Sequence, residues 1–119
     1  MDIPKIEAIL KHLTDSIPQI KLSMIVTPDG LTLSYEGEVD DAENVGALCI
    51  ELELICGKIC SQLDNGQLKE MFIRSDKSSM TILPIENKGI LACLTATDIN
   101  SRMMMHVTWK AVEALEKII

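Results

Sequence analysis

The sequence predicts an α+β domain whose elements follow the order helix, two strands, helix, three strands, helix. Apolar residues recur every three or four positions in three long segments and alternate in five short ones, as helices and strands require. Turn-forming residues separate these segments, and no linker, repeat or low-complexity stretch interrupts the 119 residues. This length predicts a single domain over residues 1–119, because one core usually serves about 100–150 residues.

The first part of the chain predicts a helix followed by a hairpin. The helix is expected over residues 4–17, because Pro4 suits a first helical turn and Pro18 stops the helix. Residues 20–27 predict a strand with one apolar face, made of Ile20, Leu22, Met24 and Val26. Pro28-Asp29-Gly30 forms a turn, and a second strand follows with Leu31, Leu33 and Tyr35 alternating.

The second part predicts a long helix, three strands and a last helix. The long helix begins at Asp40 or Asp41, both good N-caps, and runs to about Leu63, where Asp64-Asn65-Gly66 ends it. Segments 68–74, 79–83 and 90–95 predict strands joined by polar turns. The last helix is expected to begin near Asp98 or Asn100 and to reach Ile119.

Composition excludes several classes of protein. The chain is 47% hydrophobic and has a net charge of -7. Binding nucleic acid through a basic field is disfavoured, because affinity for phosphates comes from lysine and arginine, and the apolar content excludes disorder. The N-terminus lacks the pattern of a secretory signal, and no apolar run is long enough for membrane insertion. Four cysteines in apolar segments indicate a reducing compartment, so a cytoplasmic location is expected.

The net negative charge lies entirely between Leu22 and Gly57. This segment has no lysine or arginine but eight acidic residues, whereas the rest of the chain has 11 basic and 10 acidic ones. A solvated loop with carboxylates near a helix N-terminus explains residues 38–43. It does not explain the absence of basic residues from the whole segment, and such a field would steer a basic partner.

The predicted helix at 41–63 is apolar on two sides. Its broader arc is the expected core face and contains Val45, Leu48, Cys49, Leu52, Ile55, Cys56, Ile59, Cys60 and Leu63. The second stripe lies nearly opposite and contains Ala47, Ile50, Leu54, Gly57 and Ser61. Either another part of the chain covers this second stripe, or a second copy covers it in a symmetric dimer. The dimer is the preferred interpretation.

No constellation in the sequence predicts catalysis. The helical cysteines point into the predicted core, so packing is a simpler interpretation than a metal or redox site, which stays an alternative. His12 and His106 lie on different predicted helices, and there is no phosphate loop or nucleophile elbow. We therefore expect no enzyme, no catalytic residue, no cofactor and no metal site.

Three segments together resemble the Roadblock family of small homodimeric domains, which includes the dynein light-chain roadblock type and prokaryotic polarity-GTPase regulators. Val26-Thr27-Pro28-Asp29-Gly30-Leu31 resembles the first hairpin, and Gly66-Gln67-Leu68-Lys69-Glu70-Met71-Phe72-Ile73 resembles the passage from middle helix to third strand. Gly89-Ile90-Leu91-Ala92-Cys93-Leu94 with Asn100 resembles the fifth strand and the start of the last helix. The resemblance implies a five-stranded antiparallel sheet with one helix on one face and two on the other.

The resemblance also implies a dimer through the middle helix and the third strand, and a Ras-like small GTPase as partner. The second stripe falls at the family's dimer seam, so the expected interface comprises Ala47, Ile50, Leu54, Gly57, Ser61, Met71 and Ile73. The expected partner-binding residues are Glu38, Asp40, Asp41, Glu43, Glu51, Glu53 and Lys58.

The leading functional hypothesis is therefore a non-catalytic homodimeric adaptor or regulator of a small GTPase, with a GTPase-activating or scaffold role in signalling. We expect no nucleic-acid partner and no membrane insertion. One alternative is a dimeric scaffold subunit that binds no GTPase. Another is a small-ligand sensory domain of profilin or PAS-like shape, although three aromatic residues disfavour a pocket for a planar ligand.

Overall fold

A computed structural model describes residues 2–96 and 99–119, and its elements follow the predicted order. The helices are α1 (Ile3–Ser16), α2 (Ala42–Gln62) and α3 (Ser101–Glu116). The strands are β1 (Ile20–Val26), β2 (Thr32–Gly37), β3 (Met71–Arg74), β4 (Ser78–Ile85) and β5 (Gly89–Ala96). The predicted α+β class is thus confirmed. Within the described ranges, no helix combines the length and the apolar character needed to cross a membrane.

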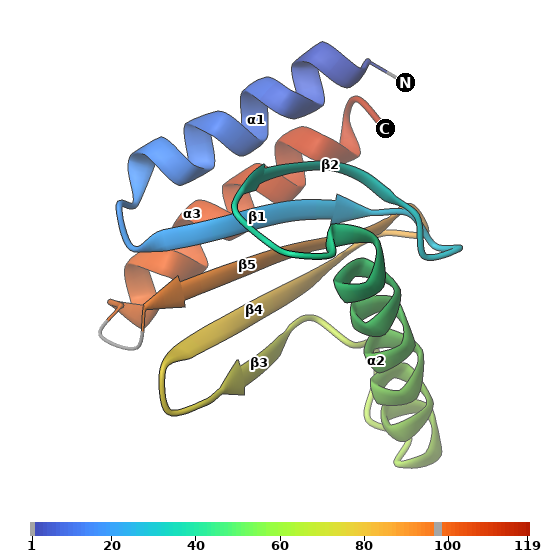
Figure 1. Cartoon of the computed structure of the whole chain (residues 1–119). Coiled ribbons are helices and arrows are strands. Elements are labelled where there is room, and N and C mark those ends of the chain that lie inside the picture. Colours follow the sequence, from blue (N-terminus) through green and yellow to red (C-terminus); the bar gives the residue numbers. More distant parts are fainter. Residues whose placement is uncertain (1, 97–98) are drawn as a thin grey trace.

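The five strands form one antiparallel sheet in the order β2-β1-β5-β4-β3. Strands β2 and β3 are therefore the two edges, and β5 lies at the centre. Helices α1 and α3 cover one face of the sheet, and α2 crosses the other face (Figure 1). The expected arrangement of one helix against two is confirmed.

Each face of the sheet has its own apolar cluster. The larger cluster packs α1 and α3 onto the sheet through fully buried side chains such as Ile6, Leu10 and Leu115. The smaller cluster lies under α2, which supplies only Cys49 and Ile50 to its buried members. Full burial of one large aliphatic side chain contributes about 1.5–3 kcal/mol. Helix α2 therefore supplies fewer buried apolar side chains to its cluster than α1 or α3 supplies to theirs, and Ala42, Val45, Leu52 and Cys56 add partly buried contacts.

Strand β1 departs from the predicted alternation at its start. Leu22, Met24 and Val26 share the α2 face as expected, but Ile20 packs in the opposite cluster with α1 and α3. The pairing register of β1 with β5 shifts between Ile20 and Leu22. A β-bulge of this kind inserts one extra residue and reverses the alternation of the side chains before it.

Two predicted boundaries were too generous. Only residues 71–74 of the predicted strand 68–74 pair with β4. If the same register is extended, Pro84 of β4 lies opposite the unpaired residues 68–70. Proline has no N–H to donate to a ladder, which explains the short strand. Helix α3 ends at Glu116 rather than at Ile119. Its N-cap is Asn100, whose side chain accepts from the backbone N–H of Met103 at 3.1 Å, and Asp98 lies outside the described residues.

Candidate partner-binding surface

Helix α2 is fixed to the sheet at its beginning. Asp41 is its N-cap and accepts a hydrogen bond from the backbone N–H of Asn44 at 3.1 Å. Gly46 lies so close to β1 and β2 that a Cβ there would collide with the Thr32 side chain and lie 3.2 Å from Val26. The Thr32 hydroxyl donates to the backbone carbonyl of Ala42 at 3.0 Å. The start of α2 therefore has no room for a larger side chain against the sheet.

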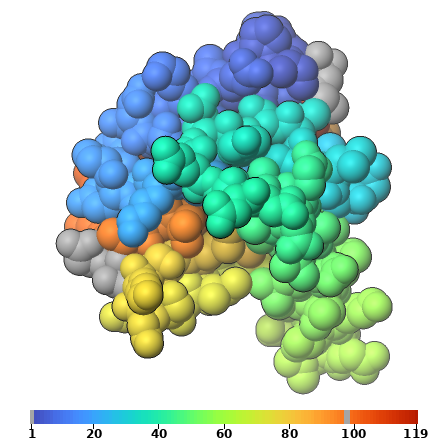
Figure 2. Space-filling view, viewed as in Figure 1, coloured from blue at the N-terminus to red at the C-terminus, as the bar shows by residue number. Residues whose placement is uncertain are grey.

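The second half of α2 leaves the sheet. All the buried residues of this helix, Gly46, Cys49 and Ile50, lie in its first half. Figure 2 shows the later turns projecting from the body of the molecule, with a hollow between them and the hairpin of β3 and β4. The last turns of α2 therefore have no sheet beneath them to cover their apolar residues.

The projecting helix carries an accessible apolar stripe. We use this name for Leu48, Leu52, Ile55, Ile59 and Leu63, which recur at steps of three and four. Leu52 is half-buried, and the other four are between 53% and 69% exposed. Single exposed leucines are ordinary, but a contiguous row of large apolar side chains marks an interaction surface.

The predicted division of α2 into two stripes was wrong for several residues, although Cys49 is buried and Val45, Leu52 and Cys56 pack against the cluster under α2 as expected. Leu48, Ile55, Ile59 and Leu63 were assigned to the core face, yet they are exposed. Ile50 was assigned to the outer stripe, yet it is only 5% exposed and packs on the sheet. The line of contact with the sheet runs through Gly46, Cys49 and Ile50, along the edge where the two predicted stripes meet. The sequence pattern identified a helix with two apolar sides but not which side meets the sheet.

Strand β3 adds a free sheet edge at the same end of the molecule (Figure 1). Its only neighbour in the described sheet is β4, so the backbone groups on its outer side have no strand partner there. Met71 is buried in the cluster under α2, and Ile73, two positions along on the same face, is 43% exposed. Of the two expected interface residues in β3, only Ile73 is therefore on the surface.

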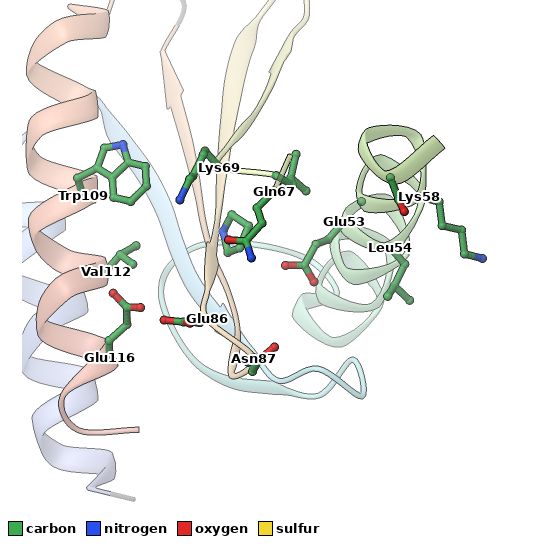
Figure 3. A pocket seen from close by; sticks show the side chains of 14 residues that line it. Glu53, Leu54, Lys58, Gln67, Lys69, Glu86, Asn87, Trp109, Val112 and Glu116 are labelled. Carbon is green, nitrogen blue, oxygen red and sulfur yellow. The ribbon is translucent and has the colours of Figure 1, made fainter. Parts of the chain in front are cut away.

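The remaining expected interface residues face a different part of the surface. Leu54, Gly57 and Ser61 line a groove of about 670 Å³ between α2 and α3, which we call the α2–α3 groove. Trp109 and Glu116 of α3 form its far wall, as Figure 3 shows. Ala47, the fifth member of the predicted outer stripe, is half-buried. Whether any of these residues contacts a second copy stays a prediction.

Carboxylates line the α2–α3 groove. Glu53, Glu86 and Glu116 point into it from α2, the β4–β5 turn and α3. Lys69 also lines it, whereas the Lys58 side chain points away (Figure 3). Glu53, one of the expected partner-binding residues, is half-buried, and this burial raises the pKa of its carboxyl group because the charged form loses hydration. The ion pairs found among the described residues, Lys5–Asp2 and Lys11–Asp15, lie elsewhere, on α1.

The other expected partner-binding residues lie on the surface, but two of them also make hydrogen bonds within the chain. Glu38, Asp40, Asp41, Glu43, Glu51 and Lys58 are exposed. Asp41 caps α2, and a Glu43 carboxylate oxygen accepts from the backbone N–H of Thr32 at 3.4 Å. The remaining acidic residues have no such contact among the described residues, so they are the better candidates for a partner.

The cysteines are placed for packing. Cys93 is fully buried at the centre of the sheet, and burial raises the pKa of its thiol to about 12. Burial also raises the pKa of the Cys49 thiol, which disfavours the reactive thiolate form. Across residues 2–96 and 99–119, no group of three His, Cys, Asp or Glu side chains is arranged to hold a metal ion.

Comparison with known proteins agrees with this arrangement. MglB of Myxococcus xanthus is similar in structure, with a TM-score of 0.92 at 18% identity, over 98% of this chain and 89% of that one. A Roadblock/LC7 domain from Streptomyces avermitilis gives 0.87 at 17% identity over 93% and 94%. The gliding protein MglB from Thermus thermophilus gives 0.85 at 10% identity over 98% and 89%. At these identities the likeness concerns the fold alone.

Sequence comparison identifies the family. A search of the curated proteins found no sequence that matches this chain. The family model of the Roadblock/LC7 domain, however, matches residues 6–95, which is well over half of the chain. Together with its element order and sheet topology, this match shows that the chain belongs to the Roadblock/LC7 family.

Proposed function

We propose that this protein is a non-catalytic homodimer that regulates or scaffolds a Ras-like small GTPase. The observation that carries the dimer is the accessible apolar stripe of α2 at the same end of the molecule as the free edge of β3. A two-fold axis beside β3 would pair the two copies of this strand and continue the sheet. It would also bring the two copies of α2 together, since such an interface uses the same patch on both subunits.

The stripe is large enough to contribute substantially to such a dimer. Its four exposed members each keep more than half of their surface in solvent. Burying that remainder gains about 1 kcal/mol per side chain, and every residue counts twice in a symmetric interface. The gain is then comparable with the cost of association, which is roughly 4–15 kcal/mol. Pairing of β3 with its copy adds backbone hydrogen bonds to this balance.

The proposed GTPase partner rests on the family and on the charge distribution. The Roadblock resemblance carries the expectation of a small GTPase, and the segment from Leu22 to Gly57 offers an acidic surface with no basic residue. Glu38, Asp40 and Glu51 are exposed on it. A partner with a basic patch would be steered to this side of the molecule. A cytoplasmic location goes with this proposal, because a GTPase partner would be there.

Two measurements test the proposal. Sedimentation equilibrium at micromolar concentration should give twice the mass of the chain, and a monomer would remove the dimer premise. A pull-down with the intact protein against small GTPases of the source organism, loaded with GDP or a GTP analogue, should retain one in preference to the rest. A stable dimer that retains none would support the alternative of a scaffold subunit without a GTPase partner.

A charge variant makes the pull-down specific. Glu51→Lys should weaken retention of the GTPase, because it reverses an exposed charge of the acidic segment on α2. Glu7→Lys, an exposed change on α1 with the same effect on net charge, should not. Equal loss in both variants would show that net charge, rather than the α2 surface, governs the interaction.

A further inference from the structure

A second groove lies on the opposite face of the sheet from α2. It has a volume of about 450 Å³ and runs between α1 and α3, so we call it the α1–α3 groove. The two helices are antiparallel, because Pro4 and Lys5 at the start of α1 line one surface hollow together with Lys117 and Ile118 at the end of the chain. The groove thus follows the length of a helix pair.

The floor of the α1–α3 groove is apolar, and its walls contain small residues. The larger apolar side chains that line it are Ile9, Leu13 and Val107. Ala8, Ala111 and Ala114 leave the space between the helices unfilled. The floor side of the groove continues into the large cluster of the core. A partner side chain inserted here would therefore lie on a surface that is already well packed underneath.

The rim of the groove differs in charge from the rest of the protein. Its titratable lining residues are His12, His106 and Lys110, and no carboxylate of residues 2–96 or 99–119 lines it. Lys5 and Lys117 lie beyond one end, and Lys5 pairs with Asp2 at 3.7 Å. The other carboxylates of the two helices are outside the lining, namely Glu7, Asp15, Glu113 and Glu116. On a chain of net charge -7, this strip is suited to acidic side chains.

The shape of the groove selects a helix as its occupant. Both walls are helices, whose backbone groups bond within each helix, so the groove offers no ladder to an extended peptide. An α-helix satisfies its own backbone and can lay an apolar face between two others. We propose that the α1–α3 groove binds an amphipathic helix of a partner protein, with its apolar stripe on the floor and its acidic flanks facing Lys110 and the two histidines.

This interaction does not depend on the proposed dimer or its GTPase. Helices α1 and α3 cover one face of the sheet, and α2 crosses the other (Figure 1). The accessible apolar stripe belongs to α2. A helix bound in the α1–α3 groove would leave the α2 surface free. The protein could then hold two partners at once, one on each face of the sheet.

The test uses a synthetic probe peptide and the intact protein. The peptide has about 18 residues, or roughly 27 Å of helix, with leucines at steps of three and four and glutamates on both flanks. A second peptide carries lysines in place of the glutamates. His12 and His106 are the only histidines of the chain, and both line the groove, so their imidazole NMR signals report directly on it. The indole signal of Trp109, the only tryptophan, reports on the α2–α3 groove instead.

The glutamate peptide should shift both imidazole signals and leave the indole signal unchanged. Lys110→Glu should weaken its binding about tenfold, as loss of one exposed attraction and gain of one repulsion imply. Ala8→Trp should abolish binding by filling the groove. Lys77→Glu, an exposed change of equal charge in the turn between β3 and β4, should leave the affinity unchanged.

Four results would overturn the proposal. They are unmoved imidazole signals, equal binding of the lysine peptide, equal weakening by Lys77→Glu, and binding of phosphatidylserine vesicles in place of the peptide. Sedimentation supplies a further control. If Lys110→Glu or Ala8→Trp changes the oligomeric state, a second copy of the chain covers this groove, and the proposed occupant is wrong.

Discussion

Replacing Ile55 with glutamate should dissociate the proposed dimer, whereas replacing its neighbour Leu54 should not. The two side chains are equally accessible in the single chain, 56% and 57% exposed, so neither change should unfold the protomer. They differ in the side of α2 that they occupy. Ile55 belongs to the accessible apolar stripe, and Leu54 lines the α2–α3 groove. The pair of variants therefore compares two surfaces of one helix under matched conditions.

The expected effect of the Ile55 change follows from its exposure. Burying the accessible half of this side chain gains about 1 kcal/mol, and the residue occurs twice in a symmetric seam. A glutamate loses that gain and places an unpaired carboxylate in an apolar interface, at a cost of about 2 kcal/mol per copy even after partial hydration. The total of roughly 6 kcal/mol corresponds to a dissociation constant raised about ten-thousand-fold.

Sedimentation velocity over a range of concentrations measures this directly. The wild type and Leu54→Glu should sediment as dimers at micromolar concentration, and Ile55→Glu as a monomer with unchanged far-UV circular dichroism. The reasoning is refuted if Leu54→Glu dissociates the dimer while Ile55→Glu leaves it intact. That outcome would restore the seam expected from the sequence pattern, with Ala47, Leu54, Gly57 and Ser61 at its centre.

Four further predictions concern the single chain and are measured by urea unfolding or by alkylation. Ser23→Ala should stabilise the protein by about 1 kcal/mol, because the buried hydroxyl has no hydrogen-bond partner among the described residues. Gly46→Ala should destabilise it by about 1–2 kcal/mol through collision with Thr32, despite the better helix propensity of alanine. Burial raises the pKa of the Glu53 carboxyl group in the folded protein. Its contribution to stability is therefore complete at pH values below its pKa in the unfolded chain, and it is lost as the pH rises through its pKa in the folded protein. Glu53→Gln should therefore be more stable than the wild type at pH 7, with a smaller difference at pH 4. Cys93, whose thiol pKa burial raises to about 12, should resist iodoacetamide until the protein unfolds, and early labelling would contradict its placement.

The order of elements could be predicted because it depends on local signals. Pro18, the Pro28-Asp29-Gly30 turn and Asn100 each act within a few residues, and the structure places an element boundary at or near each of them. The register shift that turns Ile20 to the other face depends on pairing with β5, more than 70 positions away in the sequence. Periodicity within β1 contains no information about that pairing.

The candidate site was only partly predictable, and the reason lies in α2 itself. A helix that packs on its own sheet and also contributes to a proposed interface must be apolar on both sides. Its sequence pattern therefore indicates two contact sides but not which of them faces the sheet. The assignment depends on the small residue Gly46, which lets the helix approach Thr32 and Val26 closely and so sets its rotation. That glycine was a usable signal, because a glycine inside a long helix usually has a packing reason.

The two halves of the proposed interface supply different things, and neither is sufficient alone. Strand β3 has four residues, so pairing with its copy adds only a few backbone hydrogen bonds, each worth about 1 kcal/mol net. Such pairing determines register but provides little affinity. The stripe on α2 provides affinity through apolar burial, yet apolar contact alone would tolerate sliding of one helix along the other. In the proposed dimer, a short edge strand beside an overhanging apolar helix would therefore specify one geometry, since each element limits the freedom that the other leaves.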